Sequence, residues 1–136
     1  MSCKTALITG AGSGIGEAMT KRFQQSGYRV ALFDINGPAA KLVASQMSDG
    51  KSTCVIEGDV AEDSHVRTAV EQTVVELGSL DVLINNAGIE INGTVVEQPS
   101  EDWGRQIAVN LRSVFLFSKY AIPEMKQRGG SIPARS

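Results

Sequence analysis

The chain has 136 residues, of which 42 % are hydrophobic and 21 % are charged, and this length and composition predict a single globular domain rather than a disordered chain. Its formal charge is −2 at pH 7, with no long run of either sign, which excludes an electrostatic basis for binding nucleic acid or an anionic membrane surface. No segment reaches the roughly 20 apolar residues of a membrane span, and no signal sequence is recognised at the N-terminus. We therefore expect a cytoplasmic protein.

Four short apolar runs, rich in β-branched residues, are separated by helical patterns. None of the runs alternates with polar residues, so each predicts a strand buried on both faces. The strands are expected at residues 6–9, 30–33, 53–56 and 82–84, and the helices between them at residues 14–25, 38–47 and 62–77. Strand followed by helix, repeated in this way, predicts an α/β fold with a parallel sheet and right-handed crossovers.

The helix predicted at residues 62–77 has one apolar stripe and stops before Gly78. The stripe consists of Val66, Val70, Val74 and Leu77. His65 falls on the polar side of the same helix, and we expect it to be solvated. Both cysteines, Cys3 and Cys54, match neither a metal spacing nor a secreted disulfide framework. We expect both to be buried thiols and predict no metal site.

A last helix is predicted to begin near Ser100, which is a candidate N-cap. The residues that follow helical spacing along one stripe, all but one of them apolar, are Trp103, Ile107, Leu111, Val114, Ser118, Ile122 and Met125. Trp103 begins this stripe, so we expect it in the core. Pro123 is expected to kink or end the helix, and the glycine pair at residues 129–130 to close it.

The run TGAGSGIG, at residues 9–16, follows the first predicted strand and opens the first predicted helix. Glycines allow a tight turn and close approach to the backbone, and the unpaired N–H groups of a helix start form an anion site. The strict G-x-G-x-x-G spacing is not met. A tight turn without a ligand therefore stays open as the alternative.

Asp34 ends the second predicted strand, eighteen positions after Gly16. A carboxylate there can accept hydrogen bonds from the hydroxyls of an adenosine ribose and would repel a 2′-phosphate. Neither Ser13 nor Ile35 offers a cation to hold such a phosphate, so NAD is favoured over NADP. The alternative for Asp34 is a turn cap with Asn36 and Gly37.

Several motifs in order resemble the short-chain dehydrogenase/reductase family, of the classical type, over about residues 1–132. Residues 9–16 match the family's T-G-x-x-x-G-x-G, residues 85–88 match its N-N-A-G, and Asp59-Val60 matches the pair that contacts adenine. Asn110, in Val109-Asn110-Leu111, matches the asparagine of the catalytic tetrad. Without the resemblance, residues 85–88 would be interpreted as a turn and Asn110 as an exposed polar residue.

The resemblance implies a Rossmann-like, doubly wound sheet, an NAD cofactor and one catalytic position, Asn110. The implied cofactor-binding positions are Gly10, Ser13, Gly14, Ile15, Gly16, Asp34, Asp59, Val60, Asn86, Ala87 and Gly88. Asn85 and Asn86 are expected to brace neighbouring backbone at the end of a strand.

The family's acid-base pair is a tyrosine with a lysine four positions later, and it acts with an upstream serine. Leu32 stands four positions after Tyr28, and Glu124 four positions after Tyr120. A nearby cation is what brings a tyrosine, with an ordinary pKa near ~10, into use at neutral pH. The 136 residues therefore contain no such pair.

Residues 1–132 are expected to form the N-terminal part of the family domain, with strand order 3-2-1-4 and the start of a fifth strand. Residues 133–136 are expected to be a divergent tail. The fourth strand is then an apolar edge, which favours self-association, whereas the oligomer typical of the family is not expected.

Two functions remain open from the sequence. The first is an NAD-dependent oxidoreductase acting on an alcohol or carbonyl, of which this chain holds mainly the dinucleotide-binding half. The alternative is a catalytically inactive NAD-binding fragment or an unstable truncated product, which could pair with an intact homologue. The substrate is not indicated by any motif.

Overall fold

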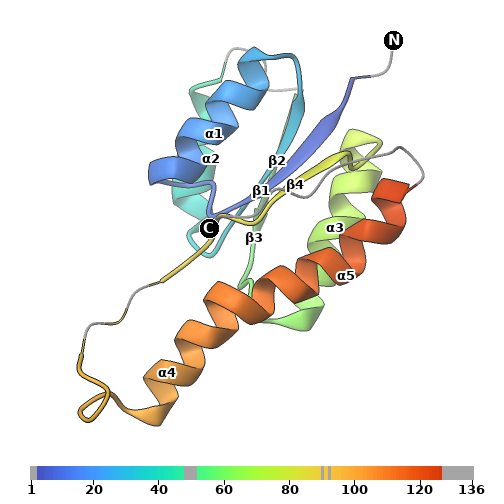
Figure 1. The fold of residues 1–136 in the computed structure, drawn as a ribbon. Helices are drawn as coiled ribbons and strands as arrows, with labels where there is room; N and C mark the ends of the chain where they lie inside the picture. Colours follow the sequence, from blue (N-terminus) through green and yellow to red (C-terminus); the bar gives the residue numbers. More distant parts are fainter. Residues whose placement is uncertain (1–2, 48–51, 90, 92, 127–136) are drawn as a thin grey trace.

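A four-stranded parallel sheet forms the centre of the protein (Figure 1). The structure, a computed structural model, describes residues 3–47, 52–89, 91 and 93–126. The strands are β1 (Thr5–Thr9), β2 (Arg29–Asp34), β3 (Thr53–Glu57) and β4 (Val82–Ile84), in the spatial order β3-β2-β1-β4. The prediction of a parallel α/β sheet in the order 3-2-1-4 is confirmed.

Two pairs of helices cover the two faces of the sheet (Figure 1). Helices α1 (Gly14–Gln25) and α2 (Gly37–Ser45) lie on one face, and α3 (Asp63–Leu77) and α5 (Ser113–Lys126) lie on the other. All five residues of β1 are buried, and a separate apolar cluster fills each face. Burial on both faces explains why β1, β2 and β4 are continuously apolar. The expectation is wrong for β3, the strand beyond β2 in the sheet order, where buried and partly exposed residues alternate.

Local signals place the helix ends close to their predicted positions. The Asn36 side chain caps α2 by accepting the N–H of Ala39 at 3.0 Å, and Pro38 lies in the first turn. Gly78 ends α3 in the left-handed conformation, with a φ of 88°. Val66, Val70 and Leu77 of the predicted α3 stripe are buried in the core. These ends depend on residues adjacent in the sequence, which is why the pattern predicts them.

The last helix covers the predicted region but is less regular than predicted. It consists of α4 (Ser100–Ile107), a π-helical turn η2 (Ala108–Arg112) and α5. Pro99 is the N-cap of α4 and Ser100 already lies in its first turn, so the prediction of Ser100 as N-cap is wrong. Pro123 lies inside α5, which continues to Lys126, so the helix does not end there.

The predicted apolar stripe of this helix is largely exposed. Trp103 is 60 % exposed and Leu111 65 % exposed, so the assignment of Trp103 to the core is wrong. The buried apolar residues are Val109, Leu116, Phe117, Ala121 and Met125, and only Met125 belongs to the predicted stripe. A π-helical turn has more residues per turn than an α-helix, so it changes the phase between α4 and α5. The phase change accounts for the stripe residues after η2, whereas Trp103 and Ile107 precede it and lie on α4, which has no buried residue.

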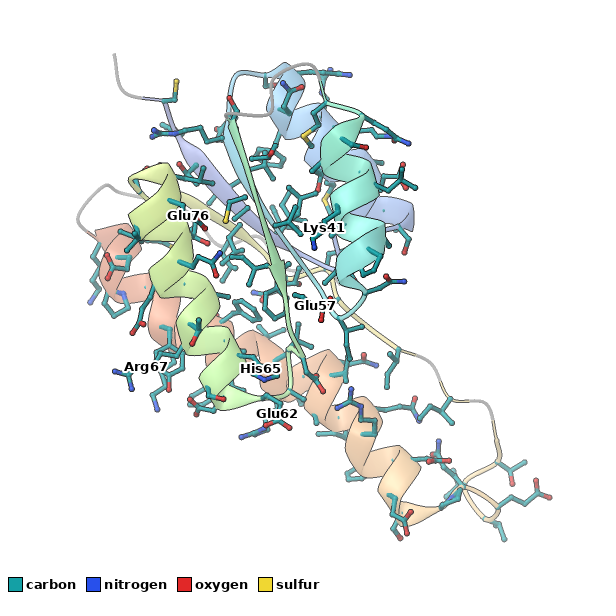
Figure 2. All side chains as sticks on the ribbon, turned by 180° about the vertical axis from the view of Figure 1, so that it is seen from behind. Lys41, Glu57, Glu62, His65, Arg67 and Glu76 are labelled. Carbon is teal, nitrogen blue, oxygen red and sulfur yellow. The ribbon has the colours of Figure 1, made fainter. Side chains whose placement is uncertain are left out.

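The two cysteines have different environments. Cys3 is exposed, so the prediction that both are buried is wrong for Cys3. It precedes β1, and its carbonyl oxygen accepts a hydrogen bond from the Arg29 guanidinium at 2.7 Å. Cys54 is buried, and its thiol donates to Oε2 of Glu76 at 3.0 Å; Glu76 is labelled in Figure 2. Burial, with the hydrogen bond to Glu76 and its charge, raises the pKa of Cys54 to about 12. Cys54 is therefore a structural thiol.

Within the described part of the chain, β4 pairs only with β1. The predicted start of a fifth strand, the glycine pair at 129–130 and the tail at 133–136 lie outside the described residues. None of the described helices has the length and apolar character needed to cross a membrane.

Candidate functional site

The glycine loop between β1 and α1 packs backbone against backbone. A Cβ on Gly16 would lie 1.9 Å from the carbonyl oxygen of Gly10, which leaves no space for any side chain. Gly10 and Gly14 have φ values of 65° and 56°, in the region that favours glycine. A Cβ on Gly14 would meet no atom within 4 Å. The loop is therefore tightly packed between Gly10 and Gly16 and open at Gly14, where a ligand can approach the helix start.

Thr9 and Asn86 join the ends of β1 and β4. The Thr9 hydroxyl, on a residue only 2 % exposed, accepts the N–H groups of Asn86 and Ala87, each at 3.0 Å. The Asn86 side chain donates to the carbonyl oxygen of Gly10 at 3.3 Å. Asn86 thus braces neighbouring backbone as predicted. Nδ2 of the buried Asn85 has no hydrogen-bond partner among the described residues.

Asp34 is held by two backbone groups at the end of β2. One carboxylate oxygen accepts the N–H of Gly12 at 2.8 Å, and the other accepts the N–H of Asn36 at 2.9 Å. The bond to Asn36 is the turn contact left open as an alternative, and the bond to Gly12 ties the carboxylate to the glycine loop. Each carboxylate oxygen still has a lone pair for another donor.

Asp59 lies just beyond the end of β3 and makes polar contacts with three residues. Its Oδ1 accepts the N–H of Ala61 at 2.9 Å, and its Oδ2 lies 3.0 Å from Nη1 of Arg105 on α4. Its own N–H donates to Nδ1 of His65 at 3.0 Å; Figure 2 shows His65 at the start of α3. Partial burial acts to raise the pKa of Asp59, but the bonds from Ala61 and Arg105 outweigh it and the pKa lies below its usual value.

These strand ends surround a pocket of about 380 Å³. Ten of the eleven predicted cofactor positions line it: Gly10, Ser13, Gly14, Ile15, Asp34, Asp59, Val60, Asn86, Ala87 and Gly88. The eleventh, Gly16, is buried beneath the loop and allows the close packing there. The predicted positions come from four loops that are far apart in the sequence, and they converge on one cavity. This cavity lies at the crevice between β1 and β4, where ligands of such sheets bind.

Asn110 does not line the pocket and instead positions the chain after β4. Its Oδ1 accepts the N–H of Ile89 and its Nδ2 donates to the carbonyl oxygen of Ile89, both at 2.8 Å. Asn110 lies in the π-helical turn η2, a type of turn that is frequent at functional sites. In this structure the side chain therefore shapes the rim of the pocket through Ile89, which does line it.

The sequence pattern missed five lining residues: Ile35, Gly58, Ile89, Arg105 and Val109. Ile35, Gly58 and Ile89 are sequence neighbours of predicted positions, and this adjacency was the available signal. Arg105 lies on α4 and had no signal, because only the tertiary structure brings α4 to the end of β3. Among the described residues that line the pocket, Arg105 is the only cation.

Tyr120 is not a substitute for a catalytic tyrosine. Its hydroxyl donates to the Asp63 carboxylate at the start of α3, outside the pocket. That hydrogen bond raises the pKa of Tyr120, the direction opposite to what acid-base work at neutral pH requires. No group of three metal-ligating side chains occurs among the described residues.

Comparison with known proteins agrees with this geometry. The family model described as short chain dehydrogenase matches residues 4–133. An uncharacterized oxidoreductase of Thermotoga maritima is 42 % identical over 130 residues, covering 95 % of this chain and 51 % of its own. A meso-2,3-butanediol dehydrogenase of Serratia marcescens is 36 % identical over 129 residues, with coverages of 95 % and 51 %.

A solved structure has the same fold over the described elements. It is a 3-ketoacyl-(acyl-carrier-protein) reductase from Brucella melitensis complexed with NADH, with a TM-score of 0.88 and 36 % identity. The alignment covers 94 % of this chain and 52 % of that one. This chain therefore spans about half the length of the relatives it matches. The family match over nearly the whole sequence, with the sheet order and the glycine loop, shows that the chain belongs to the short-chain dehydrogenase family.

Proposed function

We propose that the pocket binds NAD or NADH, and that the chain is the dinucleotide-binding part of an oxidoreductase acting on an alcohol or carbonyl group. The observation that carries this proposal is the position of Asp34. Its carboxylate lines the pocket beside the glycine loop and is fixed there by the N–H groups of Gly12 and Asn36. Residues 1–132 are proposed to be the N-terminal part of that domain, in a cytoplasmic protein.

The pyrophosphate and the adenosine half of the dinucleotide each have a matching wall of the pocket. The open backbone at Gly14 and the start of α1 suit the pyrophosphate. Asp34 suits the adjacent ribose, since an ionised carboxylate accepts hydroxyl donors. The base then falls between Ile35 and Val60, where Asp59 is available as a polar partner.

The charges favour NAD over NADP. A 2′-phosphate would be placed against the Asp34 carboxylate, and like charges at short distance repel. Arg105, the lining cation, is engaged with Asp59 rather than with the Asp34 end of the pocket. A phosphate on the ribose would therefore have repulsion without compensation.

The bound dinucleotide would act as the hydride carrier. The chain's own residues bind and orient that carrier, and Asn110 holds the rim at Ile89 in place. A tyrosine with a lysine four positions later does not occur in the sequence. Loss of a general acid or base typically costs about 10²- to 10⁴-fold in rate, so the 136 residues are expected to bind cofactor without appreciable turnover.

Calorimetric titration of the 136-residue chain with NADH and NADPH tests the proposal. Saturable binding that favours NADH, and that Asp34→Asn weakens by about 10-fold, is the expected result. Asp34→Asn keeps only one oxygen acceptor, so it loses one of the two backbone contacts to Gly12 and Asn36, and thermal unfolding of the variant establishes that it is folded. Glu71→Gln, an exposed change on α3 outside the pocket, is the matched control and should bind as the unmodified chain does. No binding by a chain that unfolds cooperatively would refute the proposal.

A second candidate function is a catalytically inactive subunit that pairs with another copy or with an intact homologue. The observation in its favour is the exposed apolar face of the last helix, where Leu111 is 65 % and Phe115 64 % exposed. Sedimentation equilibrium over a range of concentrations tests it, with a Phe115→Ser variant for comparison. A chain that stays monomeric throughout would exclude self-pairing through this face.

A further inference from the structure

Asp59 is held at both carboxylate oxygens, by two different parts of the chain. Ala61 donates its N–H to Oδ1 at 2.9 Å, and Arg105 binds Oδ2 at 3.0 Å. The Asp59 side chain is 19 % exposed, and the residue's own N–H is bound to His65. The carboxylate at the edge of the pocket is therefore fixed in orientation before any ligand arrives.

The Arg105–Asp59 ion pair differs from the other two ion pairs of the described residues. Each of the others joins residues four apart on one helix, as Arg67 and Glu71 do on α3. The Arg105–Asp59 pair instead joins α4 to the end of β3, and both partners line the pocket. Helix α4 has no buried residue of its own and continues directly into η2, where Val109 is buried, so the ion pair acts together with the apolar packing of η2 in setting the position of Arg105.

The position of Asp59 indicates the group that it would accept. The glycine loop suits phosphates and Asp34 suits a ribose, and the match of Asp59-Val60 to the family's adenine-contacting pair implies that the base of a dinucleotide lies at the end of β3. An ionised carboxylate only accepts hydrogen bonds. Among the edge groups of adenine, the exocyclic amino group is a donor, whereas hypoxanthine has a carbonyl oxygen, an acceptor, in its place.

We infer that Arg105 is a positioning residue, which fixes the Asp59 carboxylate so that the pocket selects adenine over hypoxanthine in the dinucleotide. The inference rests on the proposed function, because it requires a dinucleotide in this pocket. Arg105 acts by holding Oδ2 and by keeping the carboxylate ionised, since a neighbouring guanidinium favours the charged form. A carboxylate released from Arg105 would retain only the Ala61 contact and could turn away from the base.

The test compares NADH with reduced nicotinamide hypoxanthine dinucleotide by calorimetric titration of the 136-residue chain. The unmodified chain is expected to bind NADH about 10-fold more tightly, the effect of one hydrogen bond to a charged group. Arg105→Met should reduce this ratio to about 2-fold, mainly by weakening NADH, and Asp59→Asn should do the same. Arg105→Lys keeps the charge and should restore part of the ratio. Combining Arg105→Met with Asp59→Asn should add nothing further.

Arg67→Met is the matched control, because Arg67 is also in an exposed ion pair but lies outside the pocket. It should keep the full ratio. Thermal unfolding of each variant establishes that it is folded, and Arg105→Gln replaces Arg105→Met if the latter lowers the midpoint. An unchanged ratio in the Arg105 variants, or an equal loss for both nucleotides, would overturn the inference and leave the proposed function standing. No NADH binding by the folded unmodified chain would overturn both.

Discussion

Replacing Thr9 by valine should uncouple the ends of β1 and β4 with little change of shape. The Thr9 hydroxyl accepts the N–H groups of Asn86 and Ala87 at 3.0 Å each. Valine puts a methyl group in the place of that oxygen. The Asn86 N–H keeps a second acceptor, the carbonyl oxygen of Ile84 at 3.2 Å, whereas the Ala87 N–H loses the only acceptor that the structure describes for it.

The expected loss of stability follows from the Ala87 N–H, which is left without an acceptor. Leaving a buried donor without a partner costs about 1 to 3 kcal/mol. Ala87 is half-buried, and the weaker contact of Asn86 adds a smaller part, so we expect the free energy of unfolding to fall by about 2 kcal/mol. For a chain of this length the melting temperature should fall by about 6 °C. NADH binding should weaken too, because Asn86 and Ala87 both line the pocket.

Urea unfolding followed by circular dichroism measures the loss, and amide hydrogen exchange locates it. Thr73→Val is the matched control, because Thr73 is fully buried and its hydroxyl donates only to a carbonyl oxygen one helical turn earlier, that of Ala69. Its expected cost is below about 1 kcal/mol. Thr9→Ser keeps the hydroxyl and should keep slow exchange at Ala87. A Thr9→Val chain no less stable than Thr73→Val would refute the reasoning.

Three further predictions concern the loop, the acid range and the thiols. Gly16→Ala should abolish NADH binding, because its Cβ would lie 1.9 Å from a carbonyl oxygen. The control is Gly104→Ala on α4, which has open space around it and should leave stability unchanged or raise it by up to about 1 kcal/mol. Equal NADH binding by both variants would show that the loop packing is irrelevant to the ligand. The folded-state pKa of Asp59 is lowered, so its ionised form stabilises the fold above the unfolded pKa of about 3.9. The difference in unfolding free energy between the unmodified chain and Asp59→Asn should therefore be present at pH 7 and vanish as the pH falls through the folded pKa. A difference that is unchanged down to pH 2 contradicts this. In the native chain a thiol reagent at pH 8 should label Cys3 rapidly and leave Cys54 unreacted, since the pKa of Cys54 is about 12. In denaturant both thiols should be labelled. Rapid labelling of two thiols in the native chain would show that Cys54 is accessible.

The sequence determined the sheet and most of the pocket because both depend on local patterns. Four continuous apolar runs separated by helical periods permit a parallel sheet buried on both faces. The glycine loop, Asp34 and the N-N-A-G segment each follow a strand directly. The carboxyl ends of parallel strands lie at one edge of a sheet, so ten of the predicted positions meet there.

The tertiary structure decided the features that depend on how separate elements pack. The face of the last helix that is buried was not readable from its periodicity, because both faces carry apolar residues and the π-helical turn η2 changes the phase before α5. The role of Asn110 as a partner of the Ile89 backbone likewise required the two segments to be placed together. Arg105 had no sequence signal, because a cation acquires a role from the charge it meets, and its partner Asp59 is brought to it only when α4 and the end of β3 come together in the fold.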